Sequence, residues 1–157
     1  MKLQSLSSQH QRLSWLISQA SEFTSMEMQA HWARYTCVLA SGFLENALLE
    51  VYSQYARTRS HEMVANFVEA TLTKVQNPKA NKFVETAIAF NKSWEDGLVA
   101  FLAEDGRKEA VDAIMANRHL IAHGNNSGIS LVRVSEYLTK SVQVIEFIEE
   151  QCGIGPV

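Results

Sequence analysis

The longest helical pattern of the chain lies at residues 25–57, which read SMEMQAHWARYTCVLASGFLENALLEVYSQYAR. Apolar side chains occur around the whole circumference of this predicted helix: Trp32, Tyr35, Val38, Leu39, Phe43, Leu44, Leu48, Leu49, Val51, Tyr52 and Tyr55. A helix that is apolar on all sides lies in the centre of a bundle or in an interface. Gly42 costs about 1 kcal/mol of helix propensity, and we expect it to let another backbone come close. The segment therefore predicts the central helix of an all-α protein.

A second helix is predicted at residues 105–122, and an arginine, two histidines and an asparagine lie together around its end, at residues 117–124. Apolar residues recur at helical spacing along it, and at about 100° per residue Arg118 falls within the apolar face. A guanidinium in that position is costly unless it is paired or faces a wet cleft. Glu45, which stands among apolar residues of the long helix, is the expected carboxylate partner of Arg118.

Two histidines accompany the arginine. His119 and His123 are four residues apart, so they share one strip of the helix surface. Leu120 points away from the apolar face of the helix to its polar side, where it is an exposed apolar residue. Gly124 follows and is suited to end the helix in a left-handed conformation. The titratable groups are therefore expected at a helix end, on the boundary of the core.

The spacing Arg118-x-x-x-x-His123, followed by glycine, resembles the R-x4-6-H signature of the HEPN superfamily. The long helix extends the resemblance, because residues 35–55, with the sequence SGFLEN inside them, look like the second helix of that superfamily. The chain is most similar to RiboL-PSP-type and toxin-like members, over roughly residues 27–149. Many members have asparagine directly after the arginine, whereas here that position is His119.

The resemblance implies a metal-independent endoribonuclease, a toxin or defence effector, with its site built across a homodimer. In that interpretation Arg118 and His123 are catalytic, and His119, Asn117 and Glu45 support them. His123 deprotonates or orients the ribose 2′-OH, Arg118 stabilises the phosphorane, and the product is a 2′,3′-cyclic phosphate. RNA and an antitoxin or regulatory protein are the implied partners.

The residue types suit this chemistry. Histidine titrates near neutral pH and can transfer protons, and the guanidinium fork of arginine matches phosphate oxygens. Side chains five positions apart on a helix point about 140° apart, so one Arg118–His123 pair converges poorly on a single atom. Two copies related by a two-fold axis could build a shared cleft.

Other interpretations remain open from the sequence. Arg118 paired with Glu45 and the helix carbonyls, and His123 as a polar helix-end residue, would be purely structural. His119 and His123 have the spacing of a zinc pair, but Leu120 stands where a metalloprotease has its glutamate, so no metal or cofactor is predicted. The competing function is a catalytically silent dimeric helical module that binds a nucleotide or a partner protein.

Composition sets the frame for these predictions. Of the 157 residues, 46% are apolar and only nine are Pro or Gly, which is typical of a single globular domain. We therefore predict one helical domain at 1–157. Its core is expected at about 8–151, and its tail at 152–157 is expected to be frayed. The expected elements of this up-and-down bundle of five to seven helices are 8–23, 25–57, 60–75, 78–91, 93–103, 105–122 and 135–151.

Charge and cysteine usage limit the function classes. The net charge of −3 excludes a generally basic nucleic-acid binder, so RNA would need a local basic group. Candidate cations for such contacts are Arg57, Arg59, Lys79, Lys82 and Arg133. Cys37 and Cys152 form no disulfide framework, and Cys37 is expected to be a buried thiol. No apolar run is long enough for a membrane span, and a cytoplasmic location is the default expectation.

Overall fold

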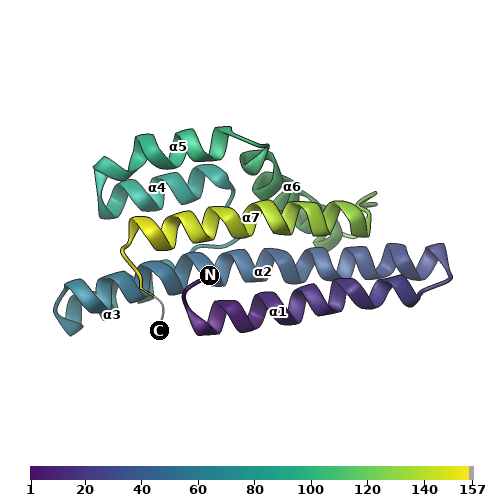
Figure 1. The fold of residues 1–157 in the computed structure, drawn as a ribbon, viewed down its shortest axis with the longest axis horizontal. Coiled ribbons are helices and arrows are strands. Elements are labelled where there is room, and N and C mark those ends of the chain that lie inside the picture. Colours follow the sequence, from purple (N-terminus) through teal and green to yellow (C-terminus); the bar gives the residue numbers. More distant parts are fainter. Residues whose placement is uncertain (156–157) are drawn as a thin grey trace.

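The computed structural model of the protein describes residues 1–155, and the side chain of Ser21 lies outside that description. Helices make up the secondary structure of these residues, with no strand among them. The elements are α1 (Gln4–Gln19), η1 (Ala20–Glu22), α2 (Met26–Arg59), α3 (Glu62–Leu72), α4 (Ala80–Phe90), η2 (Lys92–Trp94), α5 (Glu95–Ala103), α6 (Arg107–Ala122) and α7 (Leu131–Gln151). The predicted all-α fold is confirmed (Figure 1).

Helix α2 is the axis of the molecule. Its 34 residues run the length of the bundle, with α1 and α7 lying along it and α6 crossing at one end (Figure 1). Helix α2 contacts α1, α3, α6 and α7, and it buries a broad apolar face that includes Leu44, Leu48, Val51 and Tyr52. The predicted central position of this helix is thus confirmed. A helix with several neighbouring helices needs apolar residues on each side that contacts one of them.

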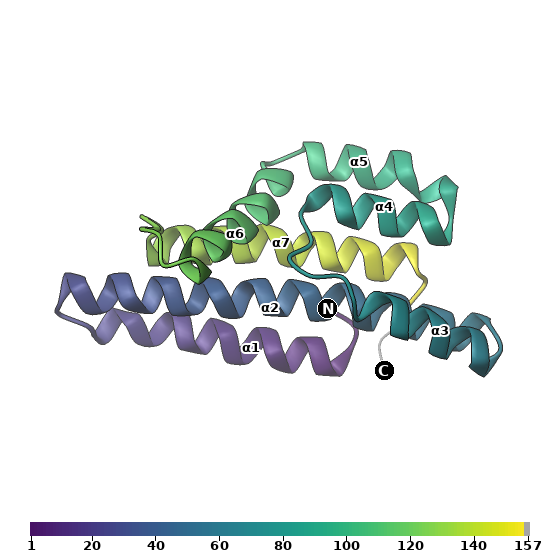
Figure 2. The ribbon, with the colours of Figure 1, turned by 180° about the vertical axis from the view of Figure 1, so that it is seen from behind.

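The remaining helices lie at the periphery. Helices α4 and α5 form a hairpin that lies on the far side of α7 from α2 in the view of Figure 1, and α5 also contacts α6. Helix α3 packs against α2 and lies at the end of the molecule opposite the α6–α7 connection, as both views show (Figures 1 and 2). Its outer face exposes Met63, Val64 and Phe67.

Helices α2 and α7 give the largest share of the buried side chains in the core, and α1, α3, α4, α5 and α6 contribute fewer each. Tyr52 stacks on Phe90 of α4 with 4.8 Å between ring centroids. Cys37 is fully buried, and this burial raises the pKa of its thiol to about 11. The predicted buried thiol is thus confirmed. Among the described residues, no helix is both long and apolar enough to cross a membrane.

The ordered structure extends beyond the predicted core at both ends. Leu3 and Leu6 are buried, and Glu149 of α7 accepts hydrogen bonds from the main-chain N–H groups of Lys2 and Leu3. Cys152 and Ile154 are also buried. The prediction of a frayed tail is therefore wrong for residues 152–154, whose apolar side chains complete the core. Residues 156–157 lie outside the described part of the chain.

Two local predictions are wrong. Helix α7 begins at Leu131, four residues before the predicted start, because the Ser130 hydroxyl accepts the N–H of Arg133 and caps the helix there. The predicted extended connection at 128–134 is correspondingly shorter. Gly42 lies on the exposed surface, and a side chain added there would meet no atom within 4 Å. It therefore admits no close backbone in this chain.

Candidate functional site

The end of α6 is closed by main-chain hydrogen bonds around Gly124. The Gly124 N–H donates to the Ile121 carbonyl at 3.1 Å, and the Asn125 N–H donates to the Leu120 carbonyl at 2.9 Å. This pair of bonds is a Schellman ending, which requires the residue after the cap to be left-handed, and Gly124 has φ 70°. His123 is the C-cap residue, so its ring stands at the edge of the helix end, as the sequence predicts.

The two histidines lie next to each other on this helix end. His119 and His123 are both exposed, and 4.4 Å separates their ring centroids. The predicted shared strip of helix surface is confirmed. Two imidazoles at this distance can serve as proton acceptor and proton donor for one reacting group, because histidine titrates near neutral pH.

The side chain of Arg118 is half-buried and makes no hydrogen bond or ion pair with the residues from 1 to 155. A half-buried cation that has no anionic partner in its own chain can bind an anionic group of another molecule. Its planar fork of N–H donors suits a phosphate or carboxylate group. The site therefore combines one free guanidinium with two exposed imidazoles on the last turn of one helix.

The expected pairing of Arg118 with Glu45 is wrong in this chain. Glu45 Oε1 instead accepts the main-chain N–H of Asn77 at 2.5 Å. Asn77 lies in the connection between α3 and α4 with φ 50°, where the turn leaves its N–H without a helical partner. The carboxylate thus anchors a loop, which the sequence alone did not reveal because 32 positions separate the two residues.

Asn117 also has a structural position. Its Nδ2 donates to the Ala113 carbonyl at 2.8 Å, and its Oδ1 accepts from the buried Ser127 hydroxyl at 2.7 Å. The carboxamide therefore ties the loop after the motif back onto α6. These bonds use one of the two N–H donors of the carboxamide and one of the two lone pairs of its oxygen.

The zinc interpretation lacks a third ligand in one chain. No group of three His, Cys, Asp or Glu side chains that could hold a metal ion occurs among the described residues. His119 and His123 are joined by aromatic contact rather than by a shared carboxylate.

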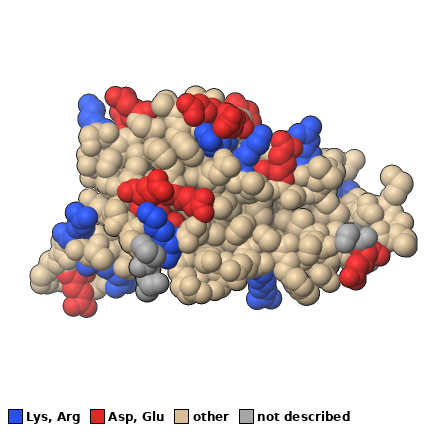
Figure 3. Space-filling model, viewed as in Figure 1, with Lys and Arg blue, Asp and Glu red and all other residues tan. Residues whose placement is uncertain are grey.

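Charges on the surface are mixed in sign. Figure 3 shows one face, on which Lys and Arg stand among Asp and Glu and leave wide uncharged areas. Three of the five predicted phosphate-contact residues are engaged in ion pairs: Arg57 with Glu69, Lys82 with Glu85 and Arg133 with Glu136. Of the five, Lys79 is the residue that shares a described cavity with the motif, through His119.

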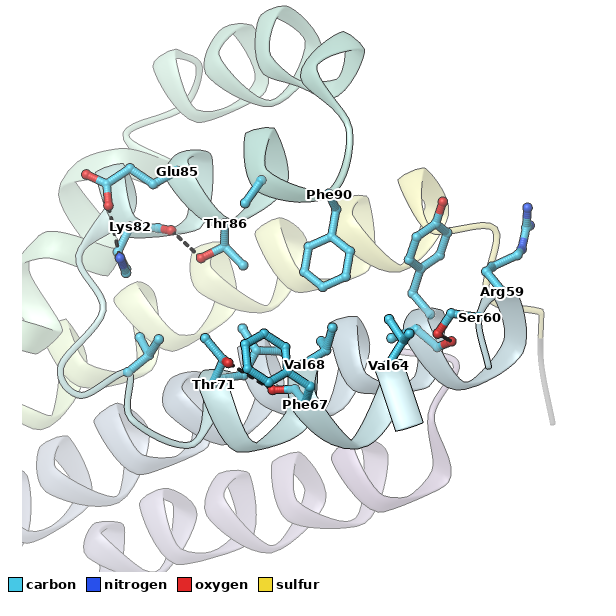
Figure 4. A pocket seen from close by; sticks show the side chains of 15 residues that line it. Arg59, Ser60, Val64, Phe67, Val68, Thr71, Lys82, Glu85, Thr86 and Phe90 are labelled. Atoms are coloured by element: carbon cyan, nitrogen blue, oxygen red, sulfur yellow. Dashed lines mark hydrogen bonds and ion pairs between the residues drawn. The ribbon is translucent and has the colours of Figure 1, made fainter. Parts of the chain in front are cut away.

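The largest described cavity lies away from the motif. It has a volume of about 570 Å³, and Val64, Phe67 and Val68 of α3 face Phe90 of α4 across it (Figure 4). Its cations are Lys82, which is paired with Glu85 at 3.1 Å, and Arg59, which lies over the Tyr55 ring. None of the residues from Arg118 to His123 lines this cavity, so it is separate from the candidate site at the end of α6.

The protein is all-helical, and its helix α6 ends in the R-x4-H spacing of Arg118 and His123. A model of the RiboL-PSP-HEPN family matches residues 6–153, and the chain belongs to this HEPN family. HEPN domains as a group are RNase-like or nucleotide-binding modules. No curated protein and no solved structure matches the chain.

Proposed function

We propose that the protein is a metal-independent endoribonuclease of HEPN type that cleaves single-stranded or looped RNA. The free guanidinium of Arg118, on the same helix turn as two adjacent imidazoles, is the observation that carries this proposal. Membership of the RiboL-PSP-HEPN family supports it. By the same family resemblance, we propose a toxin or defence role in which a partner protein holds the activity in check.

The proposed reaction is a transesterification within the RNA. His123 takes the proton from the 2′-OH, and the 2′-oxygen forms a bond to phosphorus while the bond from phosphorus to the 5′-oxygen breaks. Arg118 stabilises the negative charge that develops on the phosphorane oxygens. His119 gives a proton to the departing 5′-oxygen. The products are a 2′,3′-cyclic phosphate and a free 5′-OH, and no water is consumed.

We propose that two copies of the chain build the complete site. Arg118 and His123 project about 140° apart on one helix, so a second copy is needed to bring an arginine and a histidine to the same phosphate. Leu120, which is 37% exposed beside the motif, supplies an apolar contact for an isologous interface that includes residues 118–124.

The homodimer is tested by light scattering during gel filtration at tens of micromolar protein. We expect a mass of twice the 17.6 kDa chain, and we expect Leu120→Glu to give the monomer because it puts a carboxylate at the edge of the proposed apolar contact. Val99→Glu is the matched control, since Val99 is an exposed apolar residue of α5. A monomer mass for the unmodified protein would refute the shared site.

The catalytic proposal is tested with a labelled RNA in the presence of EDTA. We expect full cleavage with EDTA, and we expect Arg118→Lys to lower the rate by about tenfold or more, because an ammonium group cannot make the bidentate phosphate contact. The variant should melt like the wild type, since Arg118 has no internal carboxylate partner among the described residues. Cleavage that EDTA abolishes would instead favour metal binding by His119 and His123.

The second candidate function is the catalytically silent dimeric module that binds a nucleotide or a partner protein. The net charge of −3 and the histidine in place of asparagine after Arg118 favour it. Wild-type protein that cleaves no RNA, with or without EDTA, would select this module over the endoribonuclease.

A further inference from the structure

A cavity of about 430 Å³ lies against the face of α6 that leads to His123. Its volume is within the range of roughly 300–1,000 Å³ that small-molecule sites occupy. On one side it is bounded by α6, and on the other by the connection between α3 and α4. The residues that line it are Asn77, Lys79, Met115, Ala116, His119 and Leu120.

The cavity and the two histidines of the motif share one face of the helix. At 100° per residue, His123 projects between the directions of His119 and Leu120, one turn beyond the cavity. The His119 ring lines the cavity and also lies 4.4 Å from the His123 ring, measured between centroids. A ligand in the cavity would therefore lie directly beside the proposed proton-transfer pair.

The loop that forms the opposite wall is held at two points. Glu45 of α2 accepts the Asn77 N–H at 2.5 Å, and Asp112 of α6 accepts the Ala80 N–H at 2.8 Å. Pro78 between them is buried and fixes the chain further. Because α2 and α6 both anchor the loop, the fold itself holds this wall of the cavity in place.

The polar side chains of Asn77 and Lys79 on this wall have no partners among the described residues. The carboxamide of Asn77 makes no hydrogen bond, and its Oδ1 is enclosed without a donor. No bond therefore fixes the carboxamide, and it can turn toward a ligand. Lys79 is exposed and makes no ion pair among residues 1–155. Met115 and Leu120 give the α6 side of the cavity an apolar surface.

We propose that this cavity binds the unpaired nucleobase next to the cleaved phosphate of a single-stranded RNA. The apolar side chains of Met115 and Leu120 contact the face of the base. The Asn77 carboxamide, which offers one donor side and one acceptor, hydrogen-bonds its edge. Lys79 contacts the adjoining phosphate. This inference rests on the proposed function, and it adds a substrate feature: selectivity for one base position beside the cut.

A nucleobase fits the cavity for chemical reasons. Its faces are apolar and its edges carry hydrogen-bond donors and acceptors, which is the same division that the cavity walls have. Sequence-specific RNA recognition depends on bases that are splayed out of a helix, so a base held here would come from a single-stranded or looped segment. The phosphate that adjoins such a base would then lie near His119, His123 and Lys79.

The test uses Asn77→Gly in the full chain. Glycine accepts the left-handed φ of residue 77 and keeps the N–H that Glu45 binds, so only the carboxamide is lost. The control is Asn81→Ala, because Asn81 is an exposed asparagine of α4 that does not line the cavity. Lys79→Gln is compared with Lys74→Gln, which removes an exposed lysine outside the cavity.

Two measurements are made on each protein. The first is cleavage of short RNAs in which each base beside the cut is varied in turn. We expect the wild type to prefer certain bases at one position, and we expect Asn77→Gly to reduce that preference by about fivefold or more. Lys79→Gln should weaken RNA binding uniformly and lower its logarithmic salt slope by about 1. The two control variants should behave as the wild type.

The second measurement is binding of AMP, CMP, GMP and UMP by amide NMR, which needs no catalysis. We expect shifts at Asn77, Leu120 and His119 that Asn77→Gly weakens. Binding of this kind without RNA cleavage would support the base site while refuting the endoribonuclease. Cleavage that depends on His123 but has the same base preference in the wild type and Asn77→Gly would refute the base site alone. Absence of both cleavage and nucleotide binding would refute both.

Discussion

Replacing His123 with alanine is expected to slow RNA cleavage by at least about 100-fold, the usual contribution of a proton-transferring side chain. The same change should alter the free energy of unfolding by no more than about 1 kcal/mol. His123 is exposed at the C-cap of α6, and its described contact is with the ring of His119. The substitution therefore removes a reactive group without removing a buried contact.

A second histidine variant serves as the control for this result. His31 is an exposed histidine of α2 that lies near Glu27, and it is remote from the motif in sequence. We expect His31→Ala to cleave RNA at the wild-type rate. Thermal melts of both variants separate chemistry from folding. If His123→Ala cleaves as fast as the wild type, the activity comes from another site or another protein.

The proposed proton transfer by His123 has a further consequence for the other histidine. The ring contact with His119 makes the two imidazoles a unit, so their substitutions should not act independently. The double variant should then lose little more activity than His123→Ala alone. If the loss of cleavage rate in the double variant equals the product of the two single losses, His119 acts on the RNA independently of His123.

The sequence was sufficient for features that depend on local spacing. Apolar residues on all sides of residues 25–57 predict a central helix, and α2 has that place. A four-residue spacing predicts that His119 and His123 meet, and a glycine after the helix predicts its left-handed ending at Gly124. Each of these follows from the geometry of one helix, which needs no information about its neighbours.

Features that depend on distant segments could not be predicted in the same way. Glu45 stands among apolar residues of the predicted helix, which indicates that its carboxylate needs a hydrogen-bond donor or a cation nearby. The sequence does not indicate which residue provides it. The fold places its carboxylate by the Asn77 N–H rather than by Arg118. The cavity beside His119 could not be predicted for the same reason, since residues 77–79 and α6 are distant in the sequence and meet only in the folded chain. A turn residue such as Asn77 carries no sequence signal for a ligand contact.

The ends of the chain provide a similar case. Residues near a terminus are usually poorly ordered unless specific contacts hold them, and the sequence shows no such contact. In the fold, Glu149 is fully buried at 0% exposure and accepts the main-chain N–H groups of Lys2 and Leu3 at 2.8–3.0 Å. A carboxylate on α7 thus holds the beginning of the chain against the core.

Replacing Glu149 with alanine is therefore expected to lower the free energy of unfolding by about 3 kcal/mol or more. Two main-chain donors lose their charged acceptor, and each donor left without a partner costs about 1–3 kcal/mol. At this chain length the melting temperature should fall by roughly 6–12 °C. Glu150→Ala is the matched control, because Glu150 is the exposed neighbour on the same helix and should change stability by about 0.5 kcal/mol or less.

Comparison with His123→Ala makes the Glu149 result informative about function. Glu149 lies near the C-terminal end of α7, whereas the motif adjoins the connection that precedes α7, so the two are at opposite ends of that helix (Figure 1). At a temperature where both variants remain folded, Glu149→Ala should cleave RNA at the wild-type rate and His123→Ala should not. Equal melting of Glu149→Ala and Glu150→Ala would show that these hydrogen bonds add nothing to stability. A loss of cleavage by folded Glu149→Ala would mean that the beginning of the chain contributes to the site.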